Sequence, residues 1–148
     1  MNFANHTDAR VRQAFVTAAE AHCGQVDKSG ADYINHPLTV AAQVQDDVSA
    51  VIVALLHDTI EDTALTLDEL RTKILLTEAE SEALTLLTHD ESVPYLEYVA
   101  AIKSNPLARR VKIADLRHNS DLTRIDNPSP KDFARVEKYR AALKLLNA

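Results

Sequence analysis

The chain has 148 residues, a formal net charge of −6 and a hydrophobic content of 46%. This length predicts a single domain over residues 1–148 that buries a core of its own. The acidic balance argues against a broad nucleic-acid-binding face, because phosphate backbones are bound by clusters of lysine and arginine. There is no apolar signal segment and no run near the roughly 20 apolar residues of a membrane span, which predicts a soluble cytoplasmic protein.

The predicted elements are all helices. Only two glycines occur in the chain, and no Asn-Gly or Asp-Gly hairpin signal is present, which favours an all-α fold. Apolar spacing and capping signals predict one helical bundle of about eight helices with short connections. In chain order the expected helices are 8–22, one starting at 35–37, one capped by Asp46 or Asp47, 68–75, 78–87, 94–103, 106–121 and 130–146.

Three further expectations concern the cysteine, the oligomeric state and the last helix. The single cysteine, Cys23, excludes an intrachain disulfide, fits a reducing compartment and is expected to be buried. Apolar residues left on a helical surface would allow a homo-oligomer. The last helix should turn its apolar stripe inward, namely Phe133, Val136, Tyr139, Leu143 and Leu146.

A polar loop follows the first expected helix. Gly24 and Gly30 are the only glycines of the chain, and both bracket residues 25–29. Two glycines in one loop predict an unusual backbone path or close approach to a ligand. The alternative is an ordinary helix C-cap followed by a turn.

One stretch combines an apolar run with a cluster of ionisable groups. Residues 51–56 are all apolar, and His57, Asp58, Glu61 and Asp62 follow within six positions. If this stretch is helical, His57 and Glu61 lie one turn apart, and so do Asp58 and Asp62. Carboxylates are disfavoured at a helix C-terminus, and a nearby cation would explain them. The pattern predicts a metal site with a proton-transfer pair beside it.

Four residues are candidate metal ligands. His36 begins a helix after the glycine-bracketed loop, His57 and Asp58 end the apolar run, and Asp115 lies in an otherwise apolar segment where an unpaired carboxylate would be costly. Each residue taken alone could be a helix cap or a hydrogen-bonded core residue. Two histidines and two carboxylates without a thiolate argue against a structural zinc site and suit manganese, iron, cobalt or zinc.

These residues fall in three ordered blocks that span most of the chain, 21–38, 54–63 and 111–119. The pattern His36, His57-Asp58 and Asp115 resembles the HD superfamily of metal-dependent phosphohydrolases. More narrowly, the blocks resemble the hydrolase domain of RelA/SpoT-type alarmone enzymes of the stringent response and their small stand-alone relatives. The synthetase half of those enzymes has no counterpart here, so the resemblance implies hydrolysis only.

The resemblance also implies roles for individual residues. The four candidate ligands would bind one metal ion, most often Mn²⁺, while Glu61 and Asp62 would position water and handle protons. The reaction removes the 3′-pyrophosphate of guanosine tetra- or pentaphosphate (ppGpp or pppGpp), giving GDP or GTP and pyrophosphate. Lys28 and Asn119 match positions that contact substrate in the family. The expected substrate contacts are Lys28, Ser29, Tyr33, Arg117 and Asn119, although Tyr33 could belong to the core and Arg117 to the solvated surface.

Two positions depart from the family pattern. Asp27 stands where the alarmone hydrolases usually have an arginine that packs against guanine, and Asp121-Leu122 replaces an Arg-Thr pair near the substrate. A carboxylate cannot supply a guanidinium face. Two alternatives therefore stay open: a phosphohydrolase or phosphatase acting on another nucleotide or phosphorylated cofactor, and a non-catalytic helical domain that binds a metal or nucleotide.

Overall fold

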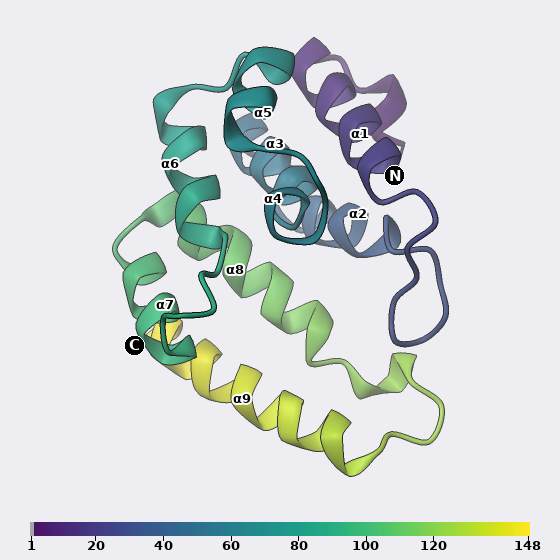
Figure 1. Ribbon diagram of the computed structural model, residues 1–148, viewed down its shortest axis with the longest axis vertical. Helices are drawn as coiled ribbons and strands as arrows, with labels where there is room; N and C mark the ends of the chain where they lie inside the picture. Colours follow the sequence, from purple (N-terminus) through teal and green to yellow (C-terminus); the bar gives the residue numbers. More distant parts are fainter. Residues whose placement is uncertain (1) are drawn as a thin grey trace.

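The computed structural model describes residues 2–148, and these residues fold into nine α-helices and two short 3₁₀ helices (Figure 1). The all-α class and the expectation of about eight helices are confirmed. Within the described residues the only extended pairing is an isolated bridge between Val26 and Asp32. The elements are η1 (Phe3–Asn5), α1 (Ala9–Ala21), α2 (Asn35–Ala42), α3 (Val48–Leu56), α4 (Thr59–Asp62), α5 (Leu67–Ile74), α6 (Glu78–Leu87), α7 (Tyr95–Lys103), α8 (Pro106–Asn119), η2 (Leu122–Arg124) and α9 (Pro130–Asn147).

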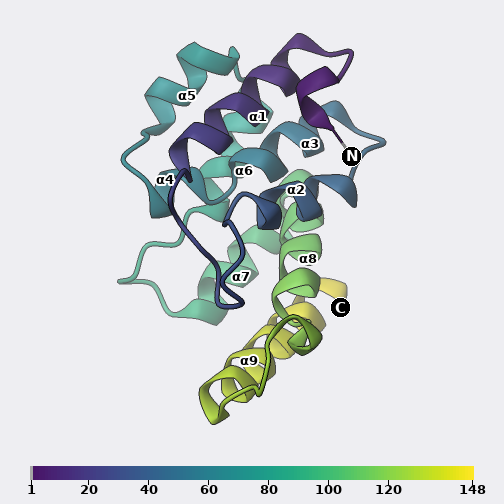
Figure 2. The same cartoon turned by 90° about the vertical axis from the view of Figure 1, so that its right-hand side faces the viewer.

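Helix α3 is the centre of the fold. It packs against α1, α2, α6 and α8, while α9 lies along α7 and α8 at one end of the molecule (Figures 1 and 2). Each residue from Ala50 to Leu56 is at most 1% exposed. A helix that is apolar on every side must be covered on every side, which explains why the most hydrophobic run of the chain lies innermost.

Local signals set the helix ends. Asp8 and Asp47 accept hydrogen bonds from the first backbone amides of α1 and α3, as N-cap residues do. The capping boxes at Thr66 and Thr77 both form, and both helices start at the following residue. Within residues 2–148 no helix is long and apolar enough to cross a membrane.

Residues 57–62 are helical only in part, and two expectations about burial are wrong. The helix that carries the apolar run ends at Leu56, and α4 is a separate turn that starts at Thr59. Phe133 is 53% exposed because the first turn of α9 extends beyond the neighbouring helices (Figure 2). Cys23 is exposed because it follows the end of α1, in the turn that leads into the glycine-bracketed loop.

A buried carboxylate fastens α6 to α1 and α3. The Glu80 side chain is fully buried and accepts hydrogen bonds from Arg10 at 2.6 and 3.2 Å, from the Ser49 hydroxyl at 2.6 Å and from the Thr77 amide at 2.9 Å. Burial alone would raise the pKa of Glu80, but these donors hold the pKa below its ordinary value. Glu80 therefore contributes stability only while it is ionised.

We expect Glu80→Gln to lower the free energy of unfolding at pH 7 by about 2–4 kcal/mol, because Arg10 loses its buried partner. The native pKa is depressed, so this contribution is present above the unfolded value and is lost as the pH falls through the native value. The difference between variant and wild type in urea unfolding should therefore shrink toward pH 3. Glu78→Gln, in the same helical turn but in an exposed ion pair with Arg71, is the matched control and should change little. Equal effects of the two variants would contradict this role of Glu80.

Candidate functional site

The four predicted metal ligands converge from three elements. His36 comes from the first turn of α2, His57 and Asp58 from the junction of α3 and α4, and Asp115 from α8. His36 Nε2 lies 2.8 Å from Asp115 Oδ1 and 3.5 Å from Asp58 Oδ2. His57 Nε2 lies 3.1 Å from Asp58 Oδ2 and 3.5 Å from Asp115 Oδ1. Residues separated by up to 79 positions thus form one cluster.

The end of α3 shapes this cluster. Neighbouring side chains on a continuous helix point about 100° apart. At the junction, Asp58 has φ −101° and ψ −3°, away from ideal helical values, and the His57 and Asp58 side chains face the same point. The two adjacent side chains thus meet where α3 ends, as expected for residues at the end of the buried helix.

The donor set fits a divalent cation. The Ala54 carbonyl lies 2.5 Å from His57 Nδ1, so Nδ1 carries the hydrogen and Nε2 is the nitrogen that would present a lone pair to a cation. Among residues 2–148 this buried Nε2 has no hydrogen-bond partner. Ligand atoms of His36, His57 and Asp58 all lie within 4.8 Å of one another. Imidazole nitrogens and carboxylate oxygens that face one point favour a positive charge between them, and a divalent metal ion supplies one.

The local electrostatics also favour positive charge. Burial alone would lower the pKa of His57, but Asp58 and Asp115 raise it well above its ordinary value. Lys112 Nζ lies 2.9 Å from Asp115 Oδ2 and helps to hold the pKa of Asp115 well below its ordinary value despite burial. Lys112 is therefore paired with Asp115 in this structure and is not available to bind phosphate.

Two further side chains orient the carboxylates. The Tyr33 hydroxyl donates to Asp58 Oδ2 at 2.6 Å, and the Asn119 amide donates to Asp115 Oδ1 at 3.0 Å. Partners of this kind fix the direction in which ligand oxygens point. Tyr33 and Asn119, both predicted as substrate contacts, thus lie beside the cluster.

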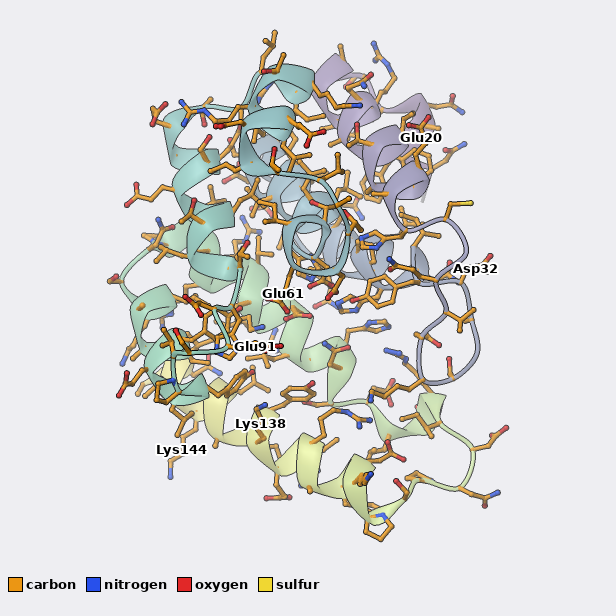
Figure 3. All side chains as sticks on the ribbon, viewed as in Figure 1. Glu20, Asp32, Glu61, Glu91, Lys138 and Lys144 are labelled. Atoms are coloured by element: carbon orange, nitrogen blue, oxygen red, sulfur yellow. The ribbon has the colours of Figure 1, made fainter. Side chains whose placement is uncertain are left out.

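Glu61 and Asp62 lie beside the cluster without joining it. Both line a cavity of about 260 Å³ together with Asp58 and Asp115. Partial burial, with Asp58 and Glu61 nearby, raises the pKa of Asp62 to about 6. Glu61 accepts a hydrogen bond from the His89 amide at 2.7 Å and faces α9 across this cavity (Figure 3). The pair is placed to exchange protons with a group held at the cluster.

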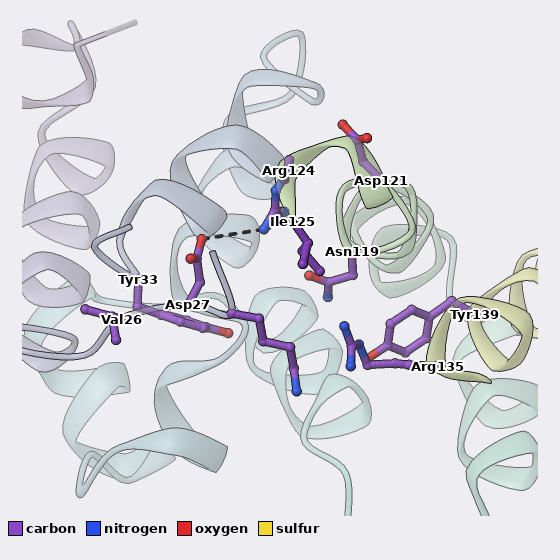
Figure 4. A pocket seen from close by; sticks show the side chains of 10 residues that line it. Val26, Asp27, Tyr33, Asn119, Asp121, Arg124, Ile125, Arg135 and Tyr139 are labelled. Atoms are coloured by element: carbon purple, nitrogen blue, oxygen red, sulfur yellow. Dashed lines mark hydrogen bonds and ion pairs between the residues drawn. The ribbon is translucent and has the colours of Figure 1, made fainter. Parts of the chain in front are cut away.

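A second cavity of about 360 Å³ adjoins the first, and Tyr33, Asn119 and Tyr139 line both (Figure 4). Its cations are Lys28, Arg124 and Arg135. Sequence reasoning missed both arginines and assigned Tyr139 to the core alone. The spacing of Arg135 and Tyr139, one helical turn apart, was the available signal.

Two predicted substrate contacts lie elsewhere. Ser29 and Arg117 are exposed and are absent from the described lining of both cavities. The Ser29 hydroxyl instead donates to Asp27 Oδ1 at 2.6 Å. Arg117 is on the solvent side of α8, which agrees with its alternative assignment to the solvated surface.

Asp27 organises the glycine-bracketed loop. Its Oδ1 accepts hydrogen bonds from the amides of Ser29 and Ala31, at 2.8 and 3.1 Å, and its Oδ2 lies 3.5 Å from Arg124 Nη2 (Figure 4). Gly24 and Gly30 both have φ +85°, a left-handed backbone conformation that favours glycine. One carboxylate oxygen shapes the loop, and the other faces an arginine at the cavity wall.

Comparisons with known proteins agree with this geometry. The model of a family described as "HD domain" matches residues 14–80. The human protein named guanosine-3′,5′-bis(diphosphate) 3′-pyrophosphohydrolase MESH1 is 35% identical over 144 residues, which cover 88% of this chain and 79% of that protein. A solved structure described as a metazoan ortholog of SpoT has a TM-score of 0.75 with 22% identity, and the match covers 97% of this chain and 86% of the other.

Longer bacterial proteins match over one part of their length. Escherichia coli SpoT, named a bifunctional (p)ppGpp synthase/hydrolase, is 34% identical over 122 residues, or 74% of this chain. A Mycobacterium leprae protein named probable GTP pyrophosphokinase is 31% identical over 146 residues. The chain spans 17% and 18% of the lengths of these two relatives.

Proposed function

Because this chain belongs to the HD-domain family that includes MESH1, we propose that it hydrolyses the 3′-pyrophosphate of ppGpp and pppGpp, giving GDP or GTP and pyrophosphate. The observation that carries the proposal is the position of the Glu61-Asp62 pair, beside a buried cluster of two histidines and two carboxylates. A simple binding domain has no need of this acidic pair. Residues 1–148 would act as one catalytic domain, in the cytoplasm where guanine nucleotides are found.

We assign Mn²⁺ as the native ion, held by His36, His57, Asp58 and Asp115. The mixed nitrogen and oxygen donors suit Mn²⁺ and also accept iron, cobalt or zinc. A divalent ion at such a site lowers the pKa of water toward neutrality and offsets phosphate charge.

The side chains around the cluster would position water, transfer a proton and orient the carboxylates. Glu61 and Asp62 position the attacking water, and Asp62, with its pKa near 6, accepts a proton from it near neutral pH. Tyr33 and Asn119 keep the Asp58 and Asp115 oxygens in their orientations. The protein thus supplies orientation and proton transfer around a site that binds cations.

The two adjoining cavities match the two ends of the proposed substrate. The smaller cavity is lined by Asp58 and Asp115 of the cluster and by Lys138, and it would take the 3′-pyrophosphate. The larger one would take the nucleoside and its 5′-phosphates, facing Lys28, Arg124 and Arg135. Local cations of this kind let a polyanion approach a protein of net charge −6.

A second candidate is supported by one observation, the Asp27–Arg124 pair at the wall of the larger cavity. An aspartate at this position could accept hydrogen bonds from a different base, and the substrate would then be another 2′- or 3′-phosphorylated nucleotide.

The direct test is a reaction of purified protein with ppGpp and Mn²⁺. We expect GDP and pyrophosphate in equal amounts, no reaction after chelation, and recovery on adding Mn²⁺. A panel of 2′- and 3′-phosphorylated nucleotides under the same conditions compares kcat/KM between substrates. Release of phosphate from another nucleotide, with no pyrophosphate from ppGpp, would contradict the assignment to ppGpp and favour the second candidate.

A further inference from the structure

His118 contacts the proposed metal ligand His36. Their Nδ1 atoms lie 2.7 Å apart, and their rings meet edge to edge and nearly in one plane, with centroids 5.0 Å apart and an interplanar angle of 15°. At this distance one Nδ1 must donate a hydrogen to the other, because two lone pairs or two N–H groups would repel. The tautomers of the two rings are therefore coupled.

The direction of this hydrogen bond follows from the other nitrogen of His36. Its Nε2 faces the oxygens of Asp58 and Asp115, at 3.5 and 2.8 Å. To bind a cation, Nε2 must present a lone pair, so Nδ1 must carry the hydrogen and His118 must accept it. The Ala54 carbonyl plays the equivalent part for His57. Each of the two histidines in the cluster thus has one hydrogen-bond acceptor next to its Nδ1.

Arg124 holds the His118 ring. Its Nη1 lies 3.1 and 2.9 Å from the two ring nitrogens of His118 and 3.2 Å from the carbonyl oxygen of the same residue. These three contacts restrict the orientation of the imidazole, so that its Nδ1 stays directed at His36 Nδ1. Asp27 Oδ2, 3.5 Å from Arg124 Nη2, pairs with the guanidinium from the loop.

We propose that His118 is a positioning residue of the metal centre, which fixes the tautomer and ring plane of His36, and that Arg124 and Asp27 hold His118 in place. Asp27 would thereby act on the metal centre through two intermediate side chains. The inference rests on the metal-binding part of the proposed function and does not depend on which nucleotide is the substrate.

The first test is metal affinity, measured by competition between the protein and a chromogenic chelator for Mn²⁺. His118→Phe keeps an aromatic ring but removes the acceptor, and we expect the dissociation constant of Mn²⁺ to rise about 10- to 100-fold. His118→Asn, whose amide oxygen can accept, should recover part of this loss. His6→Phe makes the same change far from the centre and should bind as wild type does. Urea unfolding of the metal-free variants separates an effect on binding from an effect on folding.

The second test reads the tautomer directly. Nitrogen NMR of ¹⁵N-histidine protein loaded with Zn²⁺, a diamagnetic probe, should show a hydrogen on Nδ1 of His36 in the wild type. Arg124→Gln and Asp27→Asn should weaken Mn²⁺ binding by less than His118→Phe does, within about 10-fold. Unchanged Mn²⁺ affinity in His118→Phe, or a hydrogen on Nε2 of His36 with Zn²⁺ bound, would overturn the inference and leave ppGpp hydrolysis untouched. A wild-type protein that binds neither ion would overturn the metal-dependent function as well.

Discussion

Replacement of Asp58 by alanine should abolish hydrolysis of ppGpp, with kcat/KM at least about 10³-fold lower, or about 4 kcal/mol of transition-state stabilisation. Asp58 Oδ2 lies within 3.5 Å of both histidine Nε2 atoms and accepts a hydrogen bond from the Tyr33 hydroxyl, so the substitution removes one of the two carboxylates of the cluster. The loss should appear together with loss of bound Mn²⁺ in elemental analysis.

The fold should survive this substitution. Asp58 makes no capping hydrogen bond with its side chain, and the buried part of α3 ends before it. We therefore expect unchanged helical circular dichroism and cooperative urea unfolding. Asp68→Ala, at an exposed position of α5, is the control and should keep full activity. Turnover by Asp58→Ala at the wild-type rate would rule out the assigned metal centre.

The second large effect is expected at the acidic pair. Glu61→Gln and Asp62→Asn should each lower kcat about 10²- to 10⁴-fold, the usual range for loss of a general acid or base, while Mn²⁺ affinity stays within a few-fold. Glutamine is chosen because it can still accept the hydrogen bond from the His89 amide. The separation of turnover from metal binding distinguishes these residues from ligands. Glu91→Gln, in the exposed turn before α7, is the matched control.

The dependence of kcat on pH gives a second test of the roles of Glu61 and Asp62. Asp62 must be ionised to accept a proton, so activity should fall as the pH drops through its pKa. In the metal-free protein that value is about 6, and a bound cation shifts it lower because the cation favours the carboxylate. The acidic limb of kcat against pH should therefore lie at or below pH 6 and should be absent in Asp62→Asn. An acidic limb that persists unchanged in that variant would assign it to another group.

Short segments of the sequence determine where helices begin, whereas packing between distant segments determines which side chains are buried. The starts of α5, α6 and α9 were predictable because a capping box acts within four residues. The inward position of Phe133 was predicted wrongly from the same periodicity that places Val136 correctly, since a stripe does not reveal where the neighbouring helix ends. The apolar run also placed the end of the buried helix at His57 and Asp58, and α3 ends at Leu56.

The sequence by itself determined the helices and the chemical identity of the candidate site. Caps, apolar spacing and the types of ionisable residue are properties of short segments, and the three ordered blocks carry the resemblance to the family. Only the tertiary structure decided how these groups meet. The packing of α2 and α8 on α3 places His36 and Asp115 against His57 and Asp58, and it puts His118 and Arg124 behind them. Contacts between residues 79 or more positions apart depend on that packing, which no local pattern encodes.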